Sequence, residues 1–331
     1  MKTDSSNDAK WFKDHLKGLI YGQAIGDALG LGTEFMSKSD VASKYPKGFH
    51  SYSQIYQDRH RRRWPTGSWT DDTDQMLCIL DSILDNRSVE ILDIAHRIQS
   101  WAKIEGKGIG QVVKMAVSSE YFLEDPHAAA KEVWERTAKR AASNGGVMRT
   151  SILGAWEYSS IEKVKINAEQ VCRITHYDPR CVGSCVAVSV AISLLLQRET
   201  DIHKIIDIVI QQTSEYPSEI IRYLQKSREE SIDVLDLDEG LNPMEQNCIG
   251  YTFKALGAGF WALQHASSFE QGIIKVVNEG GDADTNAAVV GSILGARDGF
   301  DCIPYRLVTE LKNGNTLDER VDRLQSLLIP V

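Results

Sequence analysis

Apolar residues recur at helical spacing along almost the whole chain, and this pattern constrains the fold more than any other feature. Leu16, Leu19 and Ile20 begin one such stretch, which Ile25 and Leu29 continue. Further helices are expected over residues 76–84, 91–104, 110–117, 126–142, 161–175, 179–196, 202–212, 218–229, 250–265, 269–278, 285–295 and 304–311. We find no convincing run of alternating polar and apolar residues that predicts a strand. The sequence therefore predicts an all-α fold, a compact many-helix bundle.

Composition limits the kinds of partner that the chain can have. Its 331 residues are 42% hydrophobic and 25% charged, and a formal net charge of −9 argues against nucleic acid as a general partner. No sharp change of composition divides the chain. We therefore expect a single domain over residues 11–331, preceded by a flexible polar N-terminal arm over residues 1–10. The longest loops, expected over residues 38–66 and 231–247, are candidates to flank a site.

The cysteines and the apolar segments bear on where the protein is found. The six cysteines form neither a CxxC pair nor a zinc-ligand spacing, and most lie in apolar helical stretches. The first ten residues lack the apolar stretch of a secretion signal. The longest apolar run, residues 181–196, is short for a membrane span and indicates a buried helix. We expect a reduced, cytoplasmic protein with no membrane partner.

Two aspartate-rich segments, about two hundred residues apart, are the strongest chemical signal in the chain. Together they supply Thr70, Asp71, Asp72, Asp282, Asp284 and Thr285. Each segment precedes a helical stretch, where helix capping alone is one explanation for acidic residues. Two matching clusters would nevertheless repel each other unless cations held them together, and carboxylate and hydroxyl oxygens suit Mg²⁺ or Mn²⁺. The pair therefore predicts a metal site with oxygen ligands only.

Weaker signals lie between the two clusters. Asn144, Gly145 and Gly146 form a loop whose backbone N–H groups can approach phosphate oxygens, although a glycine pair also serves as an ordinary helix end. His176 ends a predicted helix, where a lone histidine is usually a capping or surface residue. Neither signal alone identifies a site.

Two further signals lie near the first cluster. Glu34 follows a glycine-rich segment that predicts a flexible loop, from which its carboxylate could swing toward a site and handle a proton. The basic run over residues 59–63 is either a solvated loop or a means of drawing an anionic substrate toward the metals.

Taken together, these segments resemble the ADP-ribosylglycohydrolase family. The matching stretches are residues 26–30 with Glu34, then 70–73, 144–149, 175–176, 250–251 and 281–285. They occur in the family's order and cover nearly the whole chain. The resemblance implies an all-α fold with a binuclear metal cleft, in which two divalent cations, Mg²⁺ or Mn²⁺, lie at the base.

The resemblance also implies roles for individual residues. The implied metal ligands are Thr70, Asp71, Asp72, Asp282, Asp284 and Thr285. The residues implied to contact the substrate are Asn144, Gly145, Gly146, Met148, His176 and Tyr251. Asp71, Asp72 and Glu34 are implied as catalytic residues, although family members differ in how they use the glutamate.

The activity that the resemblance implies is hydrolysis of the bond between ADP-ribose and a protein side chain, which reverses mono-ADP-ribosylation. Arginine is the preferred acceptor, by similarity to the bacterial branch, and serine-linked or O-acetyl-ADP-ribose is the alternative. Two different functions also stay open, that of an immunity protein which counteracts an ADP-ribosylating toxin and that of a non-catalytic ADP-ribose-binding protein. The acid that protonates the leaving group is not apparent from the sequence.

Overall fold

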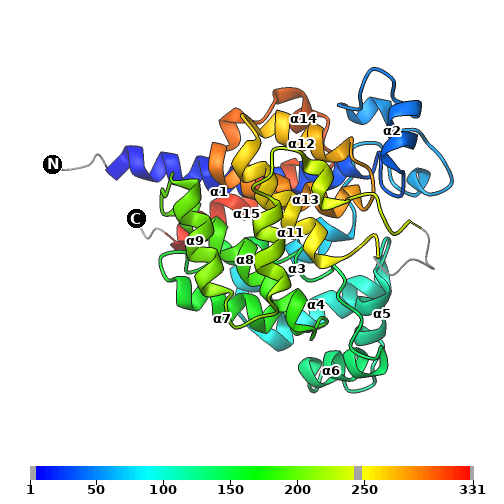
Figure 1. The fold of residues 1–331 in the computed structure, drawn as a ribbon. Helices are drawn as coiled ribbons and strands as arrows, with labels where there is room; N and C mark the ends of the chain where they lie inside the picture. The colour runs from blue at the N-terminus through cyan, green and yellow to red at the C-terminus, as the bar shows by residue number, and fades with distance from the viewer. Residues whose placement is uncertain (1–4, 242–247, 329–331) are drawn as a thin grey trace.

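The computed structural model describes residues 5–241 and 248–328, and it confirms the all-α prediction (Figure 1). Its helices are α1 (Ser5–Gly30), α2 (Lys38–Lys44), α3 (Asp71–Asn86), α4 (Ile91–Ile104), α5 (Gln111–Val117), α6 (Pro126–Arg136), α7 (Ile161–Cys172), α8 (Pro179–Leu196), α9 (Ile202–Gln212), α10 (Glu219–Lys226), α11 (Thr252–His265), α12 (Phe269–Val277), α13 (Ala283–Asp298), α14 (Tyr305–Thr309) and α15 (Asn315–Leu328). Short 3-10 turns join several of them. The β-type pairing within the described ranges is one isolated antiparallel bridge, between Ser143 and Tyr251.

Two antiparallel helices, α1 and α13, lie in direct backbone contact at the centre of the fold. Small residues recur at every fourth position of both helices, as Gly18, Gly22, Gly26 and Gly30 on α1 and Ala283, Ala287, Gly291 and Gly295 on α13. A Cβ atom added at Gly22 would stand 2.2 Å from the carbonyl oxygen of Gly291, and one at Gly26 would stand 2.0 Å from that of Ala287. Larger residues would force the helices apart. Because the helices are antiparallel, the end of α1 meets the start of α13.

The apolar helix α8 is a core helix, as its sequence predicted. It is long and apolar enough to cross a membrane by length and composition alone, but 89% of it is buried inside the protein. It packs against α7, α9, α11 and α13. Cys181 and Cys185 on α8 and Cys172 on α7 are buried free thiols, which agrees with their interpretation as small core residues.

The predicted helices over residues 126–142 and 161–175 extend too far. Helix α6 ends at Arg136, and the chain then turns through Ala138 and Lys139, which both have positive φ. Helix α7 ends at Cys172. In both places the residues that follow form the loops that line the cleft described below, so tertiary packing overrides the local helical pattern.

Two helices were absent from the sequence prediction. The long loop expected over residues 38–66 contains α2, whose start is a capping box between Ser37 and Asp40. Helix α15 buries Leu317, Val321 and Leu324 against the bundle. Its other residues are mostly polar, and this high polarity hides the helical spacing of those three.

The N-terminal arm expected over residues 1–10 lies partly outside the described residues. From Ser5 onward these residues are the first turns of α1, rather than a separate arm. Asp8 makes an ion pair of 2.9 Å with Arg198, and Gln325 donates a hydrogen bond to the carbonyl of Ala9. The division into an arm and a single domain over residues 11–331 stays a prediction.

Candidate functional site

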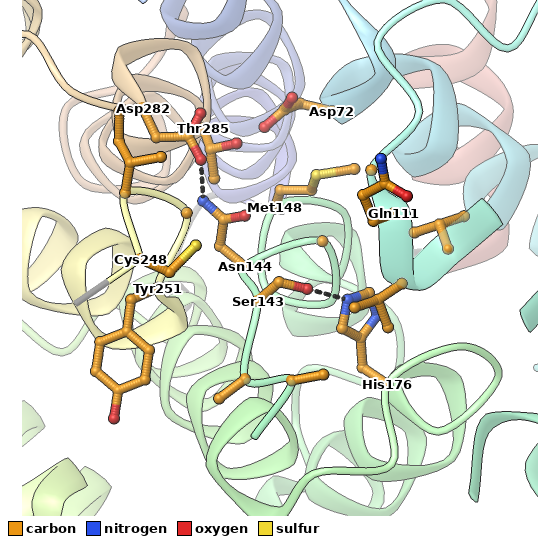
Figure 2. A pocket seen from close by; sticks show the side chains of 18 of the residues that line it. Asp72, Gln111, Ser143, Asn144, Met148, His176, Cys248, Tyr251, Asp282 and Thr285 are labelled. Carbon is orange, nitrogen blue, oxygen red and sulfur yellow. Dashed lines mark hydrogen bonds between the residues drawn. The ribbon is translucent and has the colours of Figure 1, made fainter. Parts of the chain in front are cut away.

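A cleft of about 750 Å³ opens where the N-terminal ends of α3, α11 and α13 meet the loops after α1, α4, α6 and α7 (Figure 2). The predicted site residues that line it are Glu34, Asp71, Asp72, Asn144, Gly145, Met148, His176, Tyr251, Asp282, Asp284 and Thr285. Thr70 and Gly146 lie behind its wall. Segments separated by up to about two hundred and fifty residues therefore form one site.

The floor of the cleft is acidic. Carboxylate oxygens of Glu34, Asp282 and Asp284 lie within 4.8 Å of one another, close enough to share a cation. Asp72 extends toward the same region from the first turn of α3, and the side chain of Thr285 lies in this part of the cleft as well (Figure 2). The structure thus brings the two aspartate clusters together, as the sequence predicted.

These carboxylates are buried close to other negative charges. Burial raises the pKa of Asp71 well above its usual range, and the nearby charges of Asp27 and Glu34 raise it further. Burial likewise raises the pKa of Asp284 well above its usual range, again with the charge of Glu34 adding to the effect. Without a cation the cluster is therefore costly to keep ionised.

The donor set fits hard divalent cations. Asp72 Oδ1 is buried and has no hydrogen-bond partner among the described residues, so one lone-pair direction is free for a ligand. Of the floor carboxylates, Glu34 pairs with His60, whereas none of the four aspartates forms an ion pair within the described part of the chain. Carboxylate and hydroxyl oxygens without a neutralising side chain are what Mg²⁺ and Mn²⁺ require.

Asp27 organises the first cluster and was missing from the residues that the sequence singled out for the site. It is fully buried near the end of α1, and it accepts hydrogen bonds from the backbone N–H and the hydroxyl of Thr70, at 2.9 and 2.8 Å. It accepts the same pair from Thr73, at 3.0 and 2.7 Å. Burial raises the pKa of Asp27 to about 7. The Thr70 hydroxyl makes no hydrogen bond that caps α3, although Thr70 is the residue before it, and instead donates to Asp27 and faces Asp72 at 3.1 Å.

Gly108 is a second residue of the site that the sequence did not reveal. Its backbone has φ of +86°, and an added Cβ atom would stand 2.3 Å from Asp71 Oδ1. The loop after α4 therefore presses its backbone against this carboxylate, which only a glycine permits. Gln75 donates a hydrogen bond of 3.2 Å to the other oxygen of Asp71.

Glu34 is held in place, in contrast to the flexible loop that its glycine-rich neighbourhood predicted. The side chain is 7% exposed, and its Oε2 lies 2.6 Å from Nε2 of His60. The next residue, Phe35, donates its backbone N–H to the carbonyl of Gly281 at 2.7 Å, and the N–H of Gly281 donates to Met36 at 2.8 Å. The loop that carries Glu34 is thus fastened to the turn that precedes the second cluster.

Asn144 joins the acidic floor to the glycine loop. Its Nδ2 donates a hydrogen bond of 2.7 Å to Asp282 Oδ2 (Figure 2). Its backbone N–H donates to the carbonyl of Gly250 at 2.9 Å, and Thr252 N–H donates to Ala142 at 3.0 Å. These bonds fix the loop after α6 against the start of α11, which places Tyr251 on the same cleft.

The two glycines of this loop pack against different groups. A Cβ atom at Gly145 would stand 2.8 Å from Cε1 of His176, so the absence of a side chain lets the ring pack directly against the loop. A Cβ atom at Gly146 would stand 3.0 and 3.2 Å from the sulfurs of Cys172 and Cys185. Gly146 therefore supports the loop from behind and does not face the cleft. Met148 is buried and faces the cavity.

His176 is buried in the cleft wall, in contrast to the surface position usual for such a histidine. It is 1% exposed, its Nε2 lies 2.9 Å from Ser143 Oγ and its Nδ1 lies 2.8 Å from Thr175 Oγ1 (Figure 2). Thr175 Oγ1 already accepts a hydrogen bond from Arg149, which leaves its own hydrogen free for Nδ1. The arrangement favours a neutral ring protonated on Nε2, and burial lowers the pKa of His176 to about 3.

Acidification is expected to lower the free energy of unfolding through His176. Its folded pKa of about 3 lies below the ordinary value of 6.5, so between these values only the unfolded chain binds this proton. The loss begins as pH falls below 6.5 and reaches about 3 kcal/mol near pH 4. Urea unfolding of the wild type and of His176→Gln at pH 7 and pH 4 measures this loss of unfolding free energy. An equal loss in both proteins would contradict this assignment.

The outer part of the cleft is basic. Arg140, Arg180, Arg222 and Lys226 line it together with Tyr223 and Tyr251. Arg180 is paired with Asp178 at 2.7 Å and Lys226 lies 3.7 Å from Asp236, whereas Arg140 and Arg222 form no ion pair within the described residues. The cleft is therefore polarised, with negative groups at the floor and positive groups at the mouth.

Comparison with known proteins identifies the class to which this fold and site belong. The family model for ADP-ribosylglycohydrolase matches residues 8–329. The chain belongs to the ADP-ribosylglycohydrolase family, which confirms the resemblance seen in the sequence. Membership indicates a hydrolase that acts on ADP-ribosylated substrates and uses divalent metals.

Particular relatives match over most of their length. An uncharacterized protein of Archaeoglobus fulgidus is 28% identical over 95% of this chain and 97% of its own. ADP-ribosylarginine hydrolase Tri1 of Serratia proteamaculans is 22% identical over 94% of this chain and 79% of its own. ADP-ribosyl-dinitrogen-reductase glycohydrolase of Rhodospirillum rubrum is 24% identical over 95% and 96%. A solved structure of an ADP-ribosylglycohydrolase-related protein complex matches with a TM-score of 0.75 at 25% identity, covering 97% of this chain and 100% of that one.

Proposed function

We propose that this protein is a divalent-metal-dependent hydrolase that removes ADP-ribose from modified arginine side chains of proteins. The observation that carries the proposal is the polarity of the cleft. An acidic floor that could hold divalent cations lies in the same cavity as a mouth whose arginines could pair with phosphate. ADP-ribose has a ribose at one end and a diphosphate next to it. A relative named as an ADP-ribosylarginine hydrolase supports arginine as the acceptor.

Asp71, Asp72, Asp282, Asp284 and Thr285 would hold the two cations, with Thr70 oriented by Asp27 behind them. Bound cations supply Lewis-acid polarisation of substrate oxygens and a bound water of lowered pKa. Asn144 positions the Asp282 carboxylate. The N–H groups of the loop after α6 and the ring of His176 would bind the ribose and its phosphate.

In the proposed reaction, a water oxygen forms a bond to the anomeric carbon of the ribose as the bond to the acceptor nitrogen breaks. Glu34, Asp71 or Asp72 accepts the proton that the water loses, and the leaving guanidine gains one. The surrounding carboxylates stabilise the positive charge that develops on the sugar. Free thiols at all six cysteines support a reduced, cytoplasmic setting as part of the same proposal.

A panel of substrates tests the acceptor. We expect arginine-linked ADP-ribose to be hydrolysed with kcat/KM at least about a hundredfold above serine-linked or O-acetyl-ADP-ribose, because pocket contacts to a particular acceptor group discriminate on this scale. Each substrate is assayed with Mg²⁺, with Mn²⁺ and after chelation, which is expected to abolish turnover. Preference for the serine-linked or acetylated compound would reject arginine as the acceptor. Binding of ADP-ribose without turnover of any substrate would reject the proposal that the protein is an enzyme.

A further inference from the structure

A short basic turn between α2 and α3 adjoins the edge of the cleft that Glu34 and Phe35 line, because His60 within the turn contacts both residues. We use the name basic turn for Arg59, Arg62 and Arg63, whose side chains are exposed. None of the three pairs with an acidic side chain in the part of the chain that the structure describes, although the chain has 46 acidic residues against 37 basic ones. Some other exposed arginines are paired, as Arg198 is with Asp8 and Arg323 with Asp85, whereas Arg87, Arg140 and Arg222 form no ion pair within the described residues. The basic turn is therefore an unneutralised positive surface on an acidic protein.

The basic turn is firmly attached to the loop that carries Glu34. Between its members lies Arg61, which is only 3% exposed and pairs with Asp58. The Arg61 guanidinium donates to the carbonyls of Leu31 and Gly32 at 2.9 and 3.0 Å, and also to that of Glu34. These bonds to backbone oxygens, together with the contact of His60 to Glu34, hold the exposed arginines at a fixed distance from the acidic floor.

An exposed aromatic ring lies beside the same edge. Phe35 lines the cleft, is 52% exposed, and its ring centroid is 5.2 Å from that of His60. Its φ of +60° is rare for a bulky residue, and the two backbone hydrogen bonds between residues 35–36 and Gly281 hold it there. The fold thus displays a large apolar ring next to the basic turn, which is typical of a binding surface.

We propose that the basic turn and Phe35 form a docking surface for the substrate protein, and that the segment flanking its modified residue is acidic. The inference rests on the proposed function, which places the ribose at the acidic floor and the diphosphate toward Arg140 and Arg222. The scissile bond then lies at the floor, so the acceptor chain leaves the cleft past Glu34 and Phe35. Carboxylates on that chain meet three arginines that form no ion pair within the described residues, of which Arg63 also contacts His60 and the ring of Trp64. Without them, the net charge of −9 would repel an acidic protein.

The experiment compares three substrates that carry ADP-ribose on arginine, namely the free amino acid, a peptide with acidic flanks and the same peptide with neutral flanks. In the variant Arg59→Gln/Arg62→Gln/Arg63→Gln, kcat/KM for the acidic peptide is expected to fall about tenfold, mainly through KM. The values for the neutral peptide and for the free amino acid are expected to stay within about twofold. Added salt should reduce the wild-type preference for the acidic peptide and have little effect in the variant.

A matched control removes three other exposed cations that lie away from the cleft. Lys10→Gln/Arg87→Gln/Lys131→Gln makes the same change in net charge and is expected to leave all three substrates unaffected. An equal effect of both triple variants, an equal loss on acidic and neutral peptides, or tighter binding of the basic turn to an RNA oligonucleotide than to the acidic peptide would overturn the proposal. Failure of the wild type to hydrolyse the free amino acid substrate would instead reject the proposed function.

Discussion

Replacement of Asp71 or Asp284 by asparagine is expected to abolish binding of divalent cations and to reduce kcat by at least about a hundredfold. Each change removes a negative charge from a buried cluster in which none of the four aspartates forms an ion pair within the described residues. Isothermal titration with Mg²⁺ and Mn²⁺ and turnover of arginine-linked ADP-ribose measure the two losses.

The same variants are expected to change thermal stability in a direction that a folding defect would not produce. Burial and neighbouring charges raise the pKa of both carboxylates, so in the absence of metal each ionised group destabilises the fold. The metal-free variants should therefore melt at or above the metal-free wild type. Mg²⁺ should raise the melting temperature of the wild type alone, since only that protein binds it.

Asp85→Asn is the matched control, because Asp85 lies on the same helix as Asp71 but is exposed and paired with Arg97 and Arg323. This variant should retain cation binding and turnover. Full activity, or unaltered cation affinity, in the Asp71 or Asp284 variant would reject the metal site. Loss of activity with retained cation binding would assign that carboxylate to the chemistry alone.

The two aspartate clusters that the structure brings together could be recognised from the sequence because each cluster is a local pattern. Adjacent aspartates at two helix starts are visible in a few residues, and their chemistry is the same wherever the fold puts them. Asp27 has no such local pattern. Its four donors come from Thr70 and Thr73, more than forty residues away, and two of them are backbone N–H groups that no residue type reveals.

The burial of His176 and Arg61 was not apparent from the sequence, for a related reason. Histidine and arginine are usually exposed, and spacing along the chain does not indicate burial. Both are buried because partners from distant segments satisfy their polar atoms, Ser143 for the histidine and backbone carbonyls of the loop after α1 for the arginine. Whether each side chain is buried depends on how distant segments pack around it. The local sequence does not show this packing.

The spacing of the glycines in α1 is visible in the sequence, but it has two structural explanations. Gly18, Gly22 and Gly26 stand four residues apart, which places them on one face of a helix. Glycine is unfavourable within a helix, so such a stripe indicates either a weak helix or a very close neighbour. The matching Gly291 and Gly295 on α13 resolve this, but only once the two helices are known to be partners.

Gly22→Ala and Gly26→Ala are expected to lower the free energy of unfolding by several kcal/mol, about 3 or more for each. The new methyl group would stand 2.2 or 2.0 Å from a carbonyl oxygen of α13, and neither backbone can turn away. Separation of the helices also moves Asp27 and Glu34 away from Asp282, so cation affinity should fall together with stability. Urea unfolding and Mg²⁺ titration of the same samples measure both effects.

The direction of the stability change makes this a strict test, since alanine in place of glycine within an ordinary exposed helix stabilises it by about 1 kcal/mol. Gly314→Ala is the control, because its added Cβ atom would meet its nearest neighbours at an ordinary 3.4 Å, and it should change stability little. Stabilisation by Gly22→Ala or Gly26→Ala would mean that α1 and α13 do not touch through their backbones. The carboxylate of Glu34 would then lie too far from Asp282 and Asp284 to share a cation with them.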